Sequence, residues 1–122
     1  MPFNKPKEGK STIYVYRKSN PITQGYKRSL WIDNKCIGST ANNSFFKVDV
    51  DTGVEYELST QSEASPNSID VKFDSDDNYY YEQIFTLGWA VPASKLEPRE
   101  REVAEADIML LRLGVNGECE VK

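Results

Sequence analysis

Three oxygen-bearing side chains have the spacing with which a calcium-binding loop begins. Asp74, Asp76 and Asn78 stand at alternate positions, as the first ligands of such a loop do. Tyr79 stands where the loop needs a glycine, and Phe85 stands where it needs a bidentate glutamate. We therefore predict a turn whose side chains bond the local backbone, and no cofactor. If a metal binds at all, Asp74, Asp76 and Asn78 are the candidate ligands.

The sequence offers little for covalent or acid–base catalysis. It contains no histidine, which removes the commonest general base. Cys36 would need a lysine or a carboxylate beside it to become a nucleophile. Acidic pairs such as Glu55 with Glu57 arise by chance among 19 carboxylates. We therefore predict no catalytic residues and a protein that is not an enzyme, with a hydrolase as the least favoured alternative.

Aromatic side chains are the better indication of a binding site. Residues Tyr14, Tyr16, Trp31, Phe45 and Tyr80 fall on strand faces opposite the apolar residues of the expected core. Exposed rings stack on sugars or anchor a protein partner, so we predict these five as binding residues. A helix laid over one sheet would bury such rings instead, and the sequence leaves this alternative open.

Length and charge limit the class of protein. The 122 residues suffice for one domain with one core. The 15 basic and 19 acidic residues give a net charge of −4, and no basic block marks a nucleic-acid-binding surface. We predict a domain that folds by itself and binds no nucleic acid, and the sequence does not determine its oligomeric state.

The cysteines and the first residues bear on the compartment. Cys36 and Cys119 leave one disulfide or two free thiols open. The apolar run Ile108–Leu111 is far too short to span a bilayer. Residues 1–11 lack the apolar stretch of a secretory signal, so we predict a flexible leader or tether there. Membrane attachment is then expected only through a lipid anchor that is absent from this chain.

Between Ile13 and Val91 the sequence consists of short runs in which apolar and polar residues alternate, which is typical of antiparallel β structure. Each run puts one apolar face toward a core, as Ile13 and Val15 do. Three hairpins are predicted, and in the first Trp31 lies opposite Cys36. Their turns lie at residues 33–34, 51–53 and 74–78.

The apolar period changes near the C-terminus. Apolar residues then recur at three- and four-residue steps, at Val103, Ala106, Leu110 and Leu113. Pro98 favours a first helical turn and Gly114 favours a helix end, so we predict one helix between them whose apolar stripe docks on the sheets. The pattern leaves open that Ile108–Leu113 is a final strand.

The predicted fold class is therefore mainly β: an antiparallel β-sandwich of about seven strands with one C-terminal α-helix. This domain is expected to span residues 12–113, and residues 114–122 are expected to form a C-terminal tail.

Six segments carry a family resemblance. They are Ile13–Arg17, Trp31–Gly38, Ser44–Val48, Asp51–Gly53, Tyr79–Tyr81 and the acidic helix Glu102–Leu113. In this order they resemble a bacterial family called domain of unknown function 2846, over roughly residues 12–113. The motifs are strand and turn residues rather than catalytic signatures, and Asp-Thr-Gly stands here where the family tends to have Pro-Pro-Gly.

The resemblance implies a lipoprotein-like β-sandwich module of the bacterial cell envelope, in the periplasm or at the outer-membrane surface. Such proteins often carry a lipid-anchored cysteine before a flexible tether, and no cysteine precedes the domain here. The family supplies no catalytic residues and no known activity. We expect a non-enzymatic binding module for a protein or glycan partner. The alternative is a structural accessory domain of a larger envelope complex.

Overall fold

The computed structural model of the chain describes residues 3–21, 26–61, 68–87, 92–114, 117 and 119. Within these ranges no helix has the length and apolar content needed to cross a bilayer. The elements in chain order are β1 Lys10–Arg17, β2 Arg28–Ile32, β3 Lys35–Thr40, β4 Ser44–Asp51, β5 Glu55–Thr60, β6 Ser68–Lys72, β7 Asn78–Leu87, β8 Pro92–Arg99, α1 Arg101–Ile108 and β9 Arg112–Leu113.

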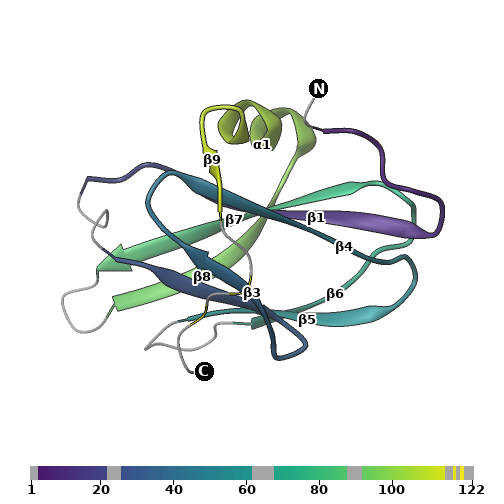
Figure 1. Cartoon of the computed structure of the whole chain (residues 1–122), viewed down its shortest axis with the longest axis horizontal. Coiled ribbons are helices and arrows are strands. Elements are labelled where there is room, and N and C mark those ends of the chain that lie inside the picture. Colours follow the sequence, from purple (N-terminus) through teal and green to yellow (C-terminus); the bar gives the residue numbers. More distant parts are fainter. Residues whose placement is uncertain are drawn as a thin grey trace.

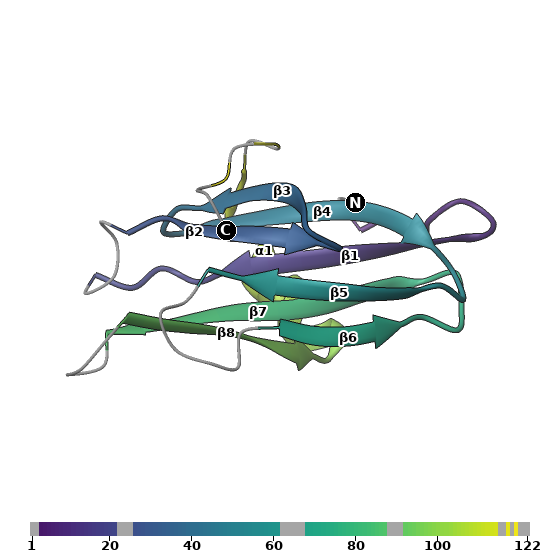
Figure 2. The same ribbon diagram turned by 90° about the horizontal axis from the view of Figure 1, so that it is seen from below.

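The strands form two sheets, and α1 lies on the outer side of the larger one (Figures 1 and 2). The larger sheet has the order β8-β7-β1-β4-β9, and the smaller one has the order β3-β2-β5-β6. The predicted mainly β class with one helix near the C-terminus is confirmed. The described strands number nine rather than about seven, and the larger sheet is mixed, because β1 runs parallel to β7 and β4 runs parallel to β9.

The mixed sheet arises where two predicted hairpins are wrong. The turns at residues 51–53 and 74–78 join β4 to β5 and β6 to β7, and in both cases the two strands belong to different sheets. Alternation cannot distinguish these cases, because a strand that crosses to the facing sheet needs the same apolar face toward the core. Both turns therefore carry the chain across the sandwich.

The first hairpin, β2 with β3, is confirmed. Asp33 and Asn34 have φ values of 47° and 67°, the left-handed backbone that tight primed turns require. Trp31 pairs with Cys36 as predicted. A register shift between Leu30 and Trp31 then sets Leu30 opposite Gly38. This irregularity increases the local twist of a strand pair at the sheet edge.

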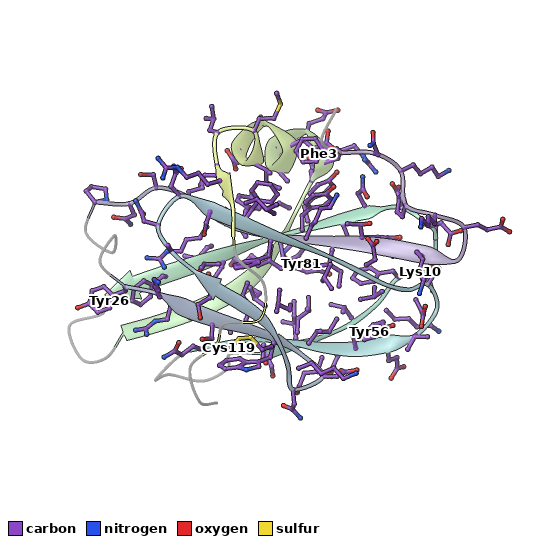
Figure 3. All side chains as sticks on the ribbon, viewed as in Figure 1. Phe3, Lys10, Tyr26, Tyr56, Tyr81 and Cys119 are labelled. Atoms are coloured by element: carbon purple, nitrogen blue, oxygen red, sulfur yellow. A yellow bond between two sulfur atoms is a disulfide. The ribbon has the colours of Figure 1, made fainter. Side chains whose placement is uncertain are left out.

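The apolar faces of both sheets meet in one core, as the alternation predicts. Tyr81 points into this space between the sheets (Figure 3). The buried members are Ile13, Val15, Leu30, Ile37, Phe46, Val50, Leu58, Val71, Phe73, Tyr81 and Leu96. The larger sheet and the smaller sheet both contribute, so neither could stay folded with its apolar face in water.

A buried polar network also joins the two sheets. Gln83 of β7 donates its Nε2 proton to Thr60 Oγ1 of β5 at 2.6 Å. The Thr40 hydroxyl of β3 donates to Gln83 Oε1, and the hydroxyls of Thr60 and Ser94 lie 3.1 Å apart. All four residues are buried, so these hydrogen bonds replace the water that their polar atoms lose on folding.

The segment after β9 is attached to both sheets. The Gly114 amide donates to Phe45 O of β4 at 2.8 Å, and the Gly117 amide donates to Ile37 O of β3 at 2.9 Å. Cys36 and Cys119 form a disulfide, which decides the alternative that the sequence left open. These contacts hold the described residues of the predicted tail along one side of the sandwich.

We predict that Gly114→Ala destabilises the protein by about 1–3 kcal/mol, the usual cost of overpacking a core. A Cβ atom at Gly114 would lie 2.4 Å from Cζ of the buried Phe46 ring. The free energy of unfolding from denaturant titration measures the effect. In a Phe46→Leu background that ring atom is gone and the substitution should cost less. Equal costs in the two backgrounds would contradict the steric explanation.

Candidate functional site

Three of the five predicted aromatic binding residues are buried in a second core beneath α1. Tyr14, Tyr16 and Tyr80 are at most 4% exposed, and they pack against Ala104 and Ile108 of the helix. The stacked rings of Tyr14 and Tyr80 have centroids 5.3 Å apart. Burial by a helix laid over one sheet, the alternative left open above, therefore describes their place in the structure. They are not exposed for a ligand.

The other two predicted binding residues lie apart from each other. Phe45 is half-buried at the border of the second core, with its ring centroid 6.5 Å from that of Tyr14. Trp31 lies on the smaller sheet, is 5% exposed, and pairs in the ladder with Cys36. The five rings consequently form no common exposed surface.

Tyrosine hydroxyls hold the helix in place. Tyr16 Oη donates to Asp107 Oδ2 at 3.1 Å, and Tyr80 Oη donates to a Glu105 carboxylate oxygen. Burial, reinforced by these hydrogen bonds, raises the pKa of Tyr16 and the pKa of Tyr80 well above the ordinary value of a phenol. The sequence analysis did not single out these two carboxylates as partners. A buried phenol needs an acceptor, which is the signal that could have indicated them.

The acidic turn at residues 74–78 is a structural anchor. Asp76 Oδ2 accepts the Gly9 amide at 2.8 Å, and this hydrogen bond lowers the pKa of the Asp76 carboxyl. Asn78 is buried, and its Nδ2 donates to the backbone of Phe3 and Asn4 at 3.4 and 3.2 Å. The prediction that these side chains bond backbone groups is confirmed, although most of their partners come from the N-terminal segment.

Of the candidate metal ligands, Asp74 is exposed, whereas Asp76 and Asn78 make the backbone contacts just given. Over the described ranges no three His, Cys, Asp or Glu side chains gather in a way that could hold a metal ion. The neighbouring Asp77 was not singled out. Its Oδ1 accepts from Arg101 Nη2 of α1 at 2.6 Å, and this hydrogen bond lowers the pKa of Asp77.

The same turn positions the beginning of the chain. The Phe3 ring lies beside α1, with centroid distances of 5.4 Å to Tyr14 and 6.3 Å to Tyr80 (Figure 3). Residues 3–9, in the segment predicted as a flexible leader, thus contact the second core and the acidic turn.

The predicted docking face of the helix is wrong. The side chains that α1 buries are Ala104 and Ile108. Pro98 lies in the edge strand β8 rather than in a first helical turn, and the helix ends at Ile108, so both alternatives for the C-terminal run hold in part: a short helix is followed by the strand Arg112–Leu113. The tyrosine–carboxylate hydrogen bonds, which periodicity does not register, orient the helix.

An apolar stripe consequently faces outward. Its members are Val103, Ala106, Met109, Leu110 and Leu113, and we call them the outward stripe. Leu110 is 80% exposed and Val103 is 50% exposed. Contiguous exposed apolar side chains on a folded domain typically mark a contact surface for another molecule.

A hollow adjoins this stripe. An open cavity of about 630 Å³ lies between the turn at residues 41–44 and the chain after α1, and Leu113 of the outward stripe is part of its wall. Asn42, Ser44 and Arg112 supply polar groups there. The helix end therefore combines exposed apolar side chains with a polar recess.

These observations define a small β-sandwich domain with a helix over one sheet and an exposed apolar surface on that helix. The chain belongs to the family described as protein of unknown function (DUF2846), whose model matches residues 7–95. An uncharacterized protein of Haemophilus influenzae is 34% identical over 114 residues, which cover 93% of this chain and 67% of that relative. No solved structure matches the chain.

We predict that Asp77→Asn lowers the melting temperature near neutral pH and that the difference from wild type disappears in acid. The folded state lowers the pKa of Asp77 below its ordinary value of 3.8. Its stabilising contribution is therefore present above that value and is lost as the pH falls. Because the pair is half-exposed, about 0.2–1 kcal/mol is expected.

Thermal melts of both proteins between pH 7 and pH 3 measure this convergence. Asp74→Asn is the matched control, because it removes a carboxylate from the same turn, and Asp74 forms no ion pair with a described residue. An Asp77→Asn defect that persists undiminished at pH 3 would show that the ion pair with Arg101 is not its cause.

Proposed function

We propose that this chain is a non-enzymatic protein-binding module of the bacterial cell envelope and that it binds its partner through the outward stripe of α1. The observation that carries the proposal is the exposure of Val103, Met109, Leu110 and Leu113 on one short segment. Large apolar side chains in water cost free energy, which a partner recovers by covering them.

The character of the stripe favours a protein over a glycan. Its side chains are aliphatic or thioether groups, which pack against other apolar side chains. Sugar binding would use exposed rings, and of the predicted aromatic residues Tyr14, Tyr16, Trp31 and Tyr80 are buried. Only Phe45 is partly accessible. The glycan alternative therefore has less support than it has from the sequence.

The envelope location is supported by the disulfide between Cys36 and Cys119. Disulfides persist in oxidising compartments such as the periplasm and are rare in the reducing cytosol. The family resemblance of the sequence implies the same compartment. Two independent lines of argument thus favour a location outside the cytosol.

The binding surface is tested by incorporating a photo-crosslinking amino acid at Leu110 in living cells. We expect a covalent adduct with a protein upon irradiation, because Leu110 lies at the centre of the exposed surface. The same amino acid at Lys72, an exposed position of β6 on the other sheet, is the control and should give no adduct. Absence of any adduct from Leu110 would refute the proposed surface.

The compartment is tested by the redox state of the cysteines in growing cells. After acid quenching and denaturation, a maleimide reagent should leave Cys36 and Cys119 unmodified, and it should modify both after reduction. Cell fractionation should recover the chain with the envelope or the periplasm. Free thiols together with recovery in the cytosol would contradict the proposal.

A further inference from the structure

We infer that the partner of the outward stripe is a second copy of this chain, packed as a symmetric antiparallel helix pair; this rests on the proposed function. A symmetric dimer places the same surface of both copies against itself, so each residue must face a complementary one across the two-fold axis. The outward stripe and its two flanking charges meet this requirement.

The centre of the stripe allows close approach of two helices. Successive helical residues are rotated by about 100°, so Ala106 lies opposite the mean direction of the buried Ala104 and Ile108. Ala106 therefore stands at the middle of the outward face, where its small side chain lets another helix come near. Val103 on one side and Leu110 on the other are the larger side chains that would pack around that crossing.

Opposite charges stand at the two ends of the stripe. Glu102 lies in the first turn of α1, and Arg112 follows the helix in β9. Both side chains are exposed, and with the described residues neither forms a hydrogen bond or an ion pair through its charged group. Arg101, in contrast, is already engaged by Asp77 and Glu105.

An antiparallel pair satisfies both charges at once. The two-fold axis passes near Ala106, and the first turn of one helix then lies beside the last turn of the other. Glu102 of each copy faces Arg112 of the other copy, and Val103 of each copy faces Leu110 of the other copy. A parallel pair would instead set Glu102 against Glu102 and Arg112 against Arg112, which repel.

The small size of the surface indicates a weak dimer. Standard interfaces involve about 20–30 residues on each side, whereas the outward stripe and its two flanking charges are seven residues. We therefore expect a concentration-dependent equilibrium rather than an obligate dimer.

Sedimentation analysis over a range of concentrations tests the inference with the full chain. The mass of the wild-type protein should rise from 13.9 kDa toward about twice that value. Glu102→Arg alone and Arg112→Glu alone should each weaken association about tenfold or more, because one substitution acts twice in a symmetric dimer. An equimolar mixture of the two variants should recover association, since each then faces the opposite charge.

Ala106→Glu is the second test, because it places a charged side chain at the crossing point and should abolish the dimer. All three substituted residues are exposed, so thermal melts of the variants should match wild type. A monomeric wild type at every concentration, a dimer insensitive to Ala106→Glu, or a variant mixture that fails to associate would each overturn the inference.

The photo-crosslinking experiment at Leu110 separates this inference from the proposed function. An adduct of twice the mass of the chain supports the second copy. An adduct of any other mass leaves a protein-binding module but overturns the dimer. No adduct overturns both the surface and its occupant.

Discussion

The arrangement of α1 depends on buried phenol groups that need hydrogen-bond acceptors. Tyr16 and Tyr80 lie on the face of the larger sheet opposite the main core, and their hydroxyls are removed from water beneath the helix. An unsatisfied buried hydroxyl costs more free energy than a small apolar contact returns. Asp107 and Glu105 satisfy these hydroxyls, and they do so only when Ala104 and Ile108 face the sheet. The stronger apolar stripe is consequently left outside.

This constraint also explains why β1 is buried on both faces. Residues 11–17 are all buried, because one face of the strand meets the smaller sheet and the other lies in the second core or beside it. Its position between β4 and β7 removes both edges from water as well. A strand so enclosed resists local opening, since each contact that it loses exposes backbone and apolar surface together.

Sequence reasoning predicts those features that local chemistry determines. Ile13 and Val15 enter the core because strand side chains alternate, and Asp33–Asn34 turns because both residues tolerate a left-handed backbone. It fails where the outcome depends on distant partners. The turn at 51–53 crosses between sheets rather than closing a hairpin, and the tyrosines are buried because a helix some 20 to 90 residues away covers them. Neither fact leaves a periodic signal in the sequence.

The disulfide and the outward stripe belong to one stretch of chain. After α1, β9 pairs with β4, Gly114 packs on the Phe46 ring, and the bond from Cys119 to Cys36 holds the following residues against the smaller sheet. This attachment restricts where the helix end and Leu113 can move relative to the sandwich. A contact surface that is held still loses less conformational entropy when a partner binds. The covalent bond therefore supports the proposed surface as well as the fold, although none of the stripe residues touches a cysteine in sequence.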